Sequence, residues 1–258
     1  TYNIRYDNPA DGQNSWTLRK AWLCDQIRKV NPDVFGIQEG LAHQVDYLDS
    51  SLAGFSHIGV GREDGATKGE FSAIFYNAGK FKLLKQSSFW LSQTPEKPSL
   101  GWDAACIRIC TFGLFRDIQT GQKFWVFNTH FDHVGMVARR NSALLILQKI
   151  DELNRNRFPV ILMGDFNGDP GSEPIRHLMA QLDDTHNFDS NSGKDTLGTF
   201  NGFDPDHQDK ERIDFIFTGK KGLTVTNCKI LREFHEGHYL SDHFPVVAEM
   251  RFVALKKP

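Results

Sequence analysis

The fold prediction rests on the stretch Val160-Ile161-Leu162-Met163-Gly164-Asp165-Phe166-Asn167. Its first four residues are continuously apolar, which is typical of a short strand buried on both faces. A carboxylate and an amide follow at its end, two positions apart, so an extended backbone points both side chains the same way. A buried strand that ends in two polar groups indicates an α/β domain with a functional site at the end of its sheet.

Strands and helices mix along the rest of the chain. Apolar spacing predicts helices over residues 17–30, 41–52, 136–154 and 172–182. Apolar or alternating runs predict strands over residues 33–39, 57–61, 71–76, 81–90, 104–118, 123–130, 159–163, 212–217, 223–230 and 244–252. No repeat or linker interrupts this mixture, so we predict one α/β domain over residues 1–258.

The composition limits the classes of function. Hydrophobic residues make up 40% and charged residues 24% of the 258 residues, as in ordinary globular proteins. The apolar runs are too short for membrane insertion. We also expect the protein to be a monomer. The net charge is −2, from 30 basic and 32 acidic residues. Because proteins that bind long duplex nucleic acid carry a basic face, this balance favours a small phosphorylated molecule or an oligonucleotide end as substrate.

The compartment is not predicted. The stretch from Thr1 to Tyr6 reads as a strand already under way, so we expect that an upstream segment was removed. A signal peptide could have been part of that segment. The four cysteines match no zinc template and do not decide the compartment either.

Oxygen-bearing side chains at the predicted strand ends are candidate metal ligands. Glu39 ends the apolar strand 33–39, and Asp242 directly precedes the last strand. With Asp165 and Asn167 they offer carboxylate and amide oxygens, which suit a hard cation such as Mg²⁺ or Mn²⁺. Asp165 and Asn167, aimed together, can also orient and deprotonate a water molecule.

Two histidines add hydrogen-bond donors to this set. His130 ends the strand 123–130, and His243 follows Asp242. Both can donate to phosphate oxygens as negative charge develops on them. Asp214, near the start of its strand, would hold His243 protonated and correctly turned. Each residue taken alone is also compatible with a purely structural role in a turn or on the surface. The set taken together indicates hydrolysis of a phosphate ester.

Three further residues are candidates for substrate binding. Arg62 lies in the Gly-rich turn 59–65, from which a guanidinium can reach a phosphate, although a solvated turn arginine fits equally. Trp102 and Asp103 can contact a base or a sugar, but a tryptophan packed on the core is the alternative. The polar segment 186–211 is long enough to be a functional loop, and we expect it to lie over the site and govern substrate choice.

Six motifs in order resemble the endonuclease/exonuclease/phosphatase superfamily. They are Tyr2-Asn3-Ile4-Arg5, Ile37-Gln38-Glu39, Asn128-Thr129-His130, Gly164-Asp165-Phe166-Asn167, Ile213-Asp214-Phe215-Ile216 and Ser241-Asp242-His243-Phe244-Pro245-Val246. Single pieces are weak signals, whereas six in the right order, over essentially the whole chain, are strong. The resemblance implies a DNase I-like four-layer α/β sandwich, with two mixed β-sheets packed face to face and helices outside.

The resemblance also implies a role for each matching residue. On the metal side it implies Glu39 as the principal ligand, Asp242 as a second carboxylate and Asn3 as an accessory group at the metal or the phosphate. On the catalytic side it implies Asp165 as the residue that activates water, with Asn167 beside it, His243 paired to Asp214 as the phosphate-stabilising histidine, and His130 as a second histidine on the phosphate.

Within the superfamily, the chain looks most similar to bacterial members near the deadenylase/nocturnin branch. The cues are residues 128–135 and Phe89-Trp90-Leu91-Ser92 before Gly101-Trp102-Asp103. This branch favours a phosphodiesterase such as a 3′-5′ exonuclease. A phosphomonoesterase acting on a sugar phosphate, or on an inositol or lipid-derived phosphate, uses the same core and stays an alternative. A non-catalytic binding module is disfavoured, because no catalytic residue type has been lost.

Overall fold

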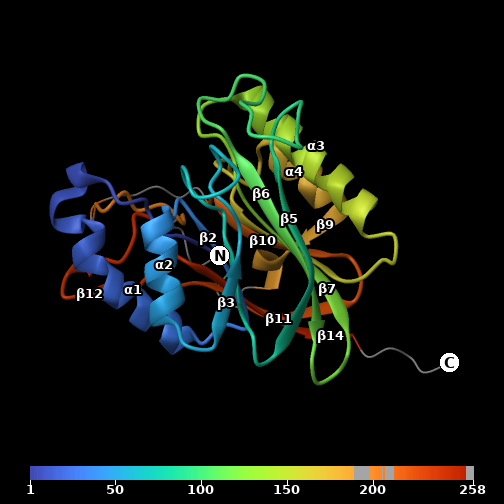
Figure 1. Ribbon diagram of the computed structural model, residues 1–258, viewed down its shortest axis with the longest axis horizontal. Helices are drawn as coiled ribbons and strands as arrows, with labels where there is room; N and C mark the ends of the chain where they lie inside the picture. The colour runs from blue at the N-terminus through green and yellow to red at the C-terminus, as the bar shows by residue number, and fades with distance from the viewer. Residues whose placement is uncertain (189–197, 205, 207–211, 254–258) are drawn as a thin grey trace.

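Two β-sheets lie face to face between two pairs of helices in the computed structural model (Figure 1). The structure describes residues 1–188, 198–204, 206 and 212–253. The helices are α1 (Trp16–Val30) and α2 (Ala42–Ser51) on one side, and α3 (Met136–Leu153) and α4 (Glu173–Gln181) on the other. This is the predicted four-layer α/β arrangement. Within the described ranges, no helix has the length and apolar character needed to cross a membrane.

The first sheet has the strand order β1-β2-β4-β3. Its strands span Tyr2–Asn3, Val34–Gln38, Ile74–Asn77 and Phe55–Ile58, in that order across the sheet. It is a mixed sheet, because β1 runs parallel to β2 and the other pairs are antiparallel. Two backbone hydrogen bonds between Thr1 and Val246, of 2.8 and 3.0 Å, continue it into β14 (Val246–Phe252), which pairs with β11 (Leu223–Ile230).

The second sheet has the order β5-β6-β7-β8-β10-β9. Its strands span Phe81–Trp90, Ile109–Asp117, Lys123–His130, Val160–Asp165, Asp214–Gly219 and Leu182–Asp184. Among its pairs within the described residues, β7–β8 alone is parallel, so this sheet is mixed too. The remaining short elements are η1 (Pro9–Asn14), η2 (Thr185–Phe188) and the antiparallel pair β12 (Phe234–His235) and β13 (His238–Tyr239).

Three buried apolar clusters fill the spaces between the four layers. The first joins Leu48 of α2 to Phe75 of β4, between helices and the first sheet. The second joins Ile74 of β4 to Val126 of β7, between the two sheets. The third joins Phe127 of β7 to apolar residues of α3 and α4. Because neighbouring positions along β4 and β7 face opposite layers, both sheets are buried on both sides there.

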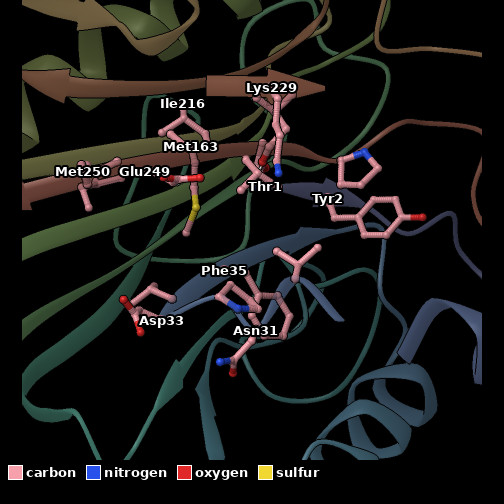
Figure 2. Close-up of a pocket in the computed structure, with 18 of the residues that line it drawn as sticks. Thr1, Tyr2, Asn31, Asp33, Phe35, Met163, Ile216, Lys229, Glu249 and Met250 are labelled. Atoms are coloured by element: carbon pink, nitrogen blue, oxygen red, sulfur yellow. Dashed lines mark hydrogen bonds between the residues drawn. The ribbon is translucent and has the colours of Figure 1, made fainter. Parts of the chain in front are cut away.

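A cavity of about 760 Å³ lies beside Thr1, where β1 is shorter than its neighbours β2 and β14. Figure 2 shows Asp33 and Phe35 on one side of it and Glu249 and Met250 on the other. None of the predicted site residues lines this cavity. We therefore interpret it as a gap in the sheet rather than as the substrate site.

Most predicted strands are present, and three of them, 81–90, 123–130 and 223–230, coincide with β5, β7 and β11. The largest difference concerns the predicted strand 104–118, since β6 begins only at Ile109. The carboxylate of Asp132 accepts hydrogen bonds from the amides of Ala105 and Cys106 at 3.1 and 3.0 Å. These amides are therefore not available for pairing with a neighbouring strand.

The predicted loop 186–211 is described only in part, because residues 189–197, 205 and 207–211 lie outside the described residues. Phe200 forms an isolated β-bridge with His243, and the amide of Asn201 donates to the carbonyl oxygen of Asp242 at 2.7 Å. Residues 198–204 therefore lie against the predicted site. That the loop governs substrate choice stays a prediction.

Candidate active site

Strand register places Asp165 between His130 and Asp214. Strand β7 runs parallel to β8 with His130 opposite Asp165, and β10 runs antiparallel on the other side with Asp214 opposite Asp165. Residues opposite one another on adjacent strands project from the same face of a sheet. All three side chains are buried. The end of β8, from which the fold prediction started, is thus the centre of a polar cluster.

His243 joins this cluster from the segment before β14. Its Nδ1 lies 2.9 Å from Oδ2 of Asp214, and its Nε2 lies 3.8 Å from Oδ2 of Asp165. Burial alone would lower the pKa of His243, but the charge of Asp214 and the hydrogen bond to it raise that pKa well above its ordinary value. The site therefore favours an imidazolium whose Nδ1 hydrogen is directed to Asp214.

Asp165 has the environment of a base that works near neutral pH. Burial raises the pKa of Asp165 to about 7, and the charge of Asp214 acts in the same direction. Its Oδ1 accepts from the amide of Asn167 at 2.9 Å, and its Oδ2 accepts from Nδ2 of Asn3 at 2.9 Å. These two hydrogen bonds fix the orientation of the carboxylate.

The orientation of Asn3 decides what this residue can offer. Its Oδ1 accepts from the amide of Arg5 at 3.1 Å, while its Nδ2 lies 3.0 Å from Oε1 of Glu39 and 2.9 Å from Oδ2 of Asp165. Both amide hydrogens therefore go to carboxylates, and the oxygen faces the backbone. The prediction that Asn3 ligates a metal does not fit this orientation, because a cation binds the amide oxygen. We assign Asn3 to the positioning of the two carboxylates.

Glu39 and Asp242 remain as candidate metal ligands. Glu39 follows β2 at a left-handed backbone angle, with φ of 66°, and its Oε2 accepts from the amide of Tyr6 at 3.2 Å. Burial raises the pKa of Asp242, and the charge of Glu39 adds to that effect. A buried carboxylate whose ionisation is opposed by a nearby negative charge is stabilised by a cation, and carboxylate oxygens suit Mg²⁺ or Mn²⁺. The residues therefore fit a hard divalent ion.

His130 is paired differently from His243. Nδ2 of Asn167 donates to the carbonyl oxygen of Phe131 at 3.0 Å and lies 3.0 Å from Nε2 of His130. Because the first contact fixes the amide, Nε2 of His130 accepts a hydrogen bond. Burial and the charges of two arginines lower the pKa of His130 well below its ordinary value. His130 is therefore a neutral neighbour of Asp165, 3.4 Å away, and we assign the charged donor to His243.

The three predicted substrate-binding residues occupy different surroundings. Arg62 is ion-paired with Glu70, with Nη1 and Oε2 2.6 Å apart. Trp102 is half-buried, at a left-handed backbone angle with φ of 47°. Asp103 accepts a hydrogen bond of 2.7 Å from the amide of Ala138 at the start of α3. Because this carboxylate caps a helix, we do not retain Asp103 as a substrate contact.

Replacing Asp103 by alanine is expected to lower stability and to leave catalysis unchanged. The loss of an acceptor at a helix N-terminus costs about 1 kcal/mol of unfolding free energy. Urea unfolding and KM measure the two effects, and Asp151→Ala, an exposed change on the same helix, is the control. A raised KM at unchanged stability would instead support Asp103 as a substrate contact.

Glu70 and Arg108 were not among the predicted site residues. Arg108 is buried just before β6, with Nε 3.6 Å from Oδ2 of Asp132 and Nη1 4.0 Å from Oε2 of Glu70. The sequence held one signal for it, a charged residue between Ile107 and Ile109 in an otherwise apolar run. A buried charge needs partners, and those partners come from distant segments.

Comparison with known proteins decides the family. The model of the Endonuclease/Exonuclease/phosphatase family matches residues 1–243. The chain belongs to this family. Its members are hydrolases that act on phosphate esters, and they are typically dependent on divalent metal ions. The motifs and the fold predicted for this superfamily are thereby confirmed, whereas the roles of the individual residues are proposals.

Several family relatives cover nearly the whole chain. The solved structure of the mannosyl-6-phosphatase Bt3783 from Bacteroides thetaiotaomicron is 38% identical, with a TM-score of 0.90, covering 97% of this chain and 98% of that one. The uncharacterized protein L388 of Acanthamoeba polyphaga mimivirus is 29% identical, covering 90% of this chain and 91% of its own. Mouse nocturnin is 22% identical over 92% of this chain, which spans 59% of nocturnin's length.

Proposed function

We propose that this family member is a divalent-metal-dependent phosphomonoesterase that acts on a sugar phosphate. The observation that carries the proposal is the relative that is 38% identical over nearly the whole chain and is named a mannosyl-6-phosphatase. The net charge of −2 also favours a small substrate over long nucleic acid. The sequence by itself favours a phosphodiesterase and keeps the monoesterase as the alternative, and this relative reverses that preference.

The proposed reaction divides the work between a base and a charged donor. Asp165 takes a proton from water, whose oxygen bonds to phosphorus while the bond to the sugar oxygen breaks, and the leaving sugar oxygen takes up a proton from solvent to become a hydroxyl. His243, held by Asp214, donates from Nε2 to the phosphate oxygens on which negative charge grows. Nε2 of His243 lies 3.8 Å from Oδ2 of Asp165 and 3.4 Å from Nδ2 of Asn3, which offers only hydrogens there.

Glu39 and Asp242 are the residues that would hold the divalent ion. When bound, such an ion would neutralise charge on the phosphate and lower the pKa of a water molecule. The proposed part of the protein is to keep both carboxylates in place. Asn3 and the amide of Tyr6 do so for Glu39, and the Arg5 guanidinium, 3.6 Å from Oδ2 of Asp242, does so for Asp242.

A phosphodiesterase is the second candidate function. It is favoured by the similarity to nocturnin and to the yeast protein named probable RNA exonuclease, which is 28% identical over 62% of this chain. The proposed chemistry at phosphorus is common to both candidates. They differ in whether the site accepts a phosphate with one or with two ester bonds.

A substrate panel distinguishes the two candidates. The wild-type protein is assayed with hexose 6-phosphates, with bis-p-nitrophenyl phosphate and with short oligonucleotides, each with Mg²⁺, with Mn²⁺ and with EDTA. We expect release of inorganic phosphate from at least one hexose phosphate at a kcat/KM well above that for either diester. Turnover of the diesters alone would replace the proposal by the second candidate.

A further inference from the structure

An arginine–glutamate pair lies directly beside the proposed metal side of the site. Two isolated β-bridges connect Phe71 to Gly40 and to Gly61. Glu70 directly precedes Phe71, and Arg62 directly follows Gly61. Glu39 directly precedes Gly40, so it lies beside the same bridges. The amide of Arg62 also donates to the carbonyl oxygen of Glu70 at 3.1 Å. The backbone thus fixes the Arg62–Glu70 pair at the edge of the cluster that contains Glu39.

The surroundings hold this pair in one arrangement. Nε1 of Trp90 donates to the carbonyl oxygen of Arg62 at 2.6 Å, which pins the loop that carries it. Arg108 lies behind Glu70 and keeps a second positive charge near it, 4.0 Å away. The side chains of Arg62 and Glu70 are only 13% and 18% exposed, whereas that of Arg108 is 6% exposed. The pair therefore offers its remaining polar atoms at a narrow opening, and Arg108 supports it from the interior.

A cavity of about 350 Å³ adjoins Arg62. It is lined by Arg62, Glu63, Lys68, Cys106 and Ile107. Arg62 thus borders the cavity, while its partner Glu70 precedes Phe71, which is bridged to Gly40 beside Glu39.

We propose that Arg62 and Glu70 bind the hydroxyl groups of the sugar that carries the reacting phosphate, and that the ring extends into the adjoining cavity. This rests on the proposed function. A guanidinium and a carboxylate held 2.6 Å apart present donors and an acceptor side by side. Neighbouring hydroxyls of a sugar ring need both. A phosphate offers only acceptors to such a pair and would meet the negative charge of Glu70, so the reacting group itself belongs nearer to His243.

Two substrates, one with and one without the sugar ring and its hydroxyls, test this assignment. Wild type and Arg62→Ala are compared on the best hexose 6-phosphate and on n-hexyl phosphate, which keeps the phosphate ester but lacks the ring hydroxyls. We expect the variant to lose about ten- to a hundredfold in kcat/KM on the sugar phosphate, mostly through KM, because hydrogen bonds to charged groups are lost. On n-hexyl phosphate the loss should be much smaller. Glu70→Gln should show the same selective loss.

Arg28→Ala is the matched control, because Arg28 is also ion-paired, with Asp25, but on the exposed face of α1. Thermal unfolding checks that each variant is folded, and Arg62→Lys serves if Arg62→Ala is not, since it keeps the charge and loses the planar fork. An equal loss on both substrates, or no loss on either, would overturn the assignment. Wild-type protein that releases no phosphate from any hexose phosphate would overturn the proposed function instead, and the assignment with it.

Discussion

Replacing Glu39 by glutamine is expected to lower kcat/KM by about three orders of magnitude at fixed Mg²⁺ or Mn²⁺, because the loss of a charged ligand removes several kcal/mol of electrostatic stabilisation at the phosphate. Wild type in excess EDTA should be inactive. The physical reason is repulsion between Glu39 and Asp242: burial raises the pKa of Asp242, and the charge of Glu39 raises it further. A cation offsets that repulsion, so removal of either partner weakens its binding.

Metal binding itself gives a readout that does not depend on turnover. The melting temperature of wild type should rise with the concentration of Mg²⁺ or Mn²⁺, since an ion that binds only the folded state stabilises it. In Glu39→Gln the rise should be much smaller. Glu152→Gln, an exposed change on α3, should behave as wild type. Full activity in EDTA, or an unchanged metal-dependent rise in the variant, would contradict the assignment of Glu39.

The arrangement of the catalytic cluster follows from features that are visible in the sequence. An apolar run such as 160–163 favours a central strand, and a central strand places its last residue among the ends of its neighbours. Asp165 therefore meets His130 and Asp214 through register alone. The strand boundaries at Phe81, Lys123 and Leu223 were also predictable from the sequence, because a turn containing glycine closely precedes each of these residues.

What the sequence did not reveal depends on contacts between distant side chains. The N-terminal part of 104–118 has a strand pattern, but Asp132 binds its amides and ends the pairing. The Arg62–Glu70 pair needs the bridges to Phe71, which no local periodicity encodes. The orientation of Asn3 is set by one backbone amide, that of Arg5, so its chemical role could not be read from residue type.

His243→Ala is expected to cost about 2–4 kcal/mol of transition-state stabilisation, which is the range for a preorganised donor to developing negative charge. The loss should fall mainly on kcat, because the charge on the phosphate oxygens grows in the transition state. His57→Ala is a matched control: Nδ1 of His57 also faces a carboxylate, Oδ1 of Asp49 at 2.8 Å, but outside the site. A loss in His243→Ala confined to KM would contradict the proposed role.

The pH dependence separates the two titrating groups of this mechanism. His243 must be protonated and Asp165 deprotonated, so kcat/KM should follow a bell-shaped curve with Asp165, whose pKa is about 7, on the acid limb. Asp214 raises the pKa of both groups, through its charge on Asp165 and through its charge and hydrogen bond on His243. Asp214→Asn therefore lowers both pKa values, and both limbs should move to lower pH. An alkaline limb that stays in place in this variant would exclude the pairing of His243 with Asp214 as the source of its charge, even if the acid limb moved.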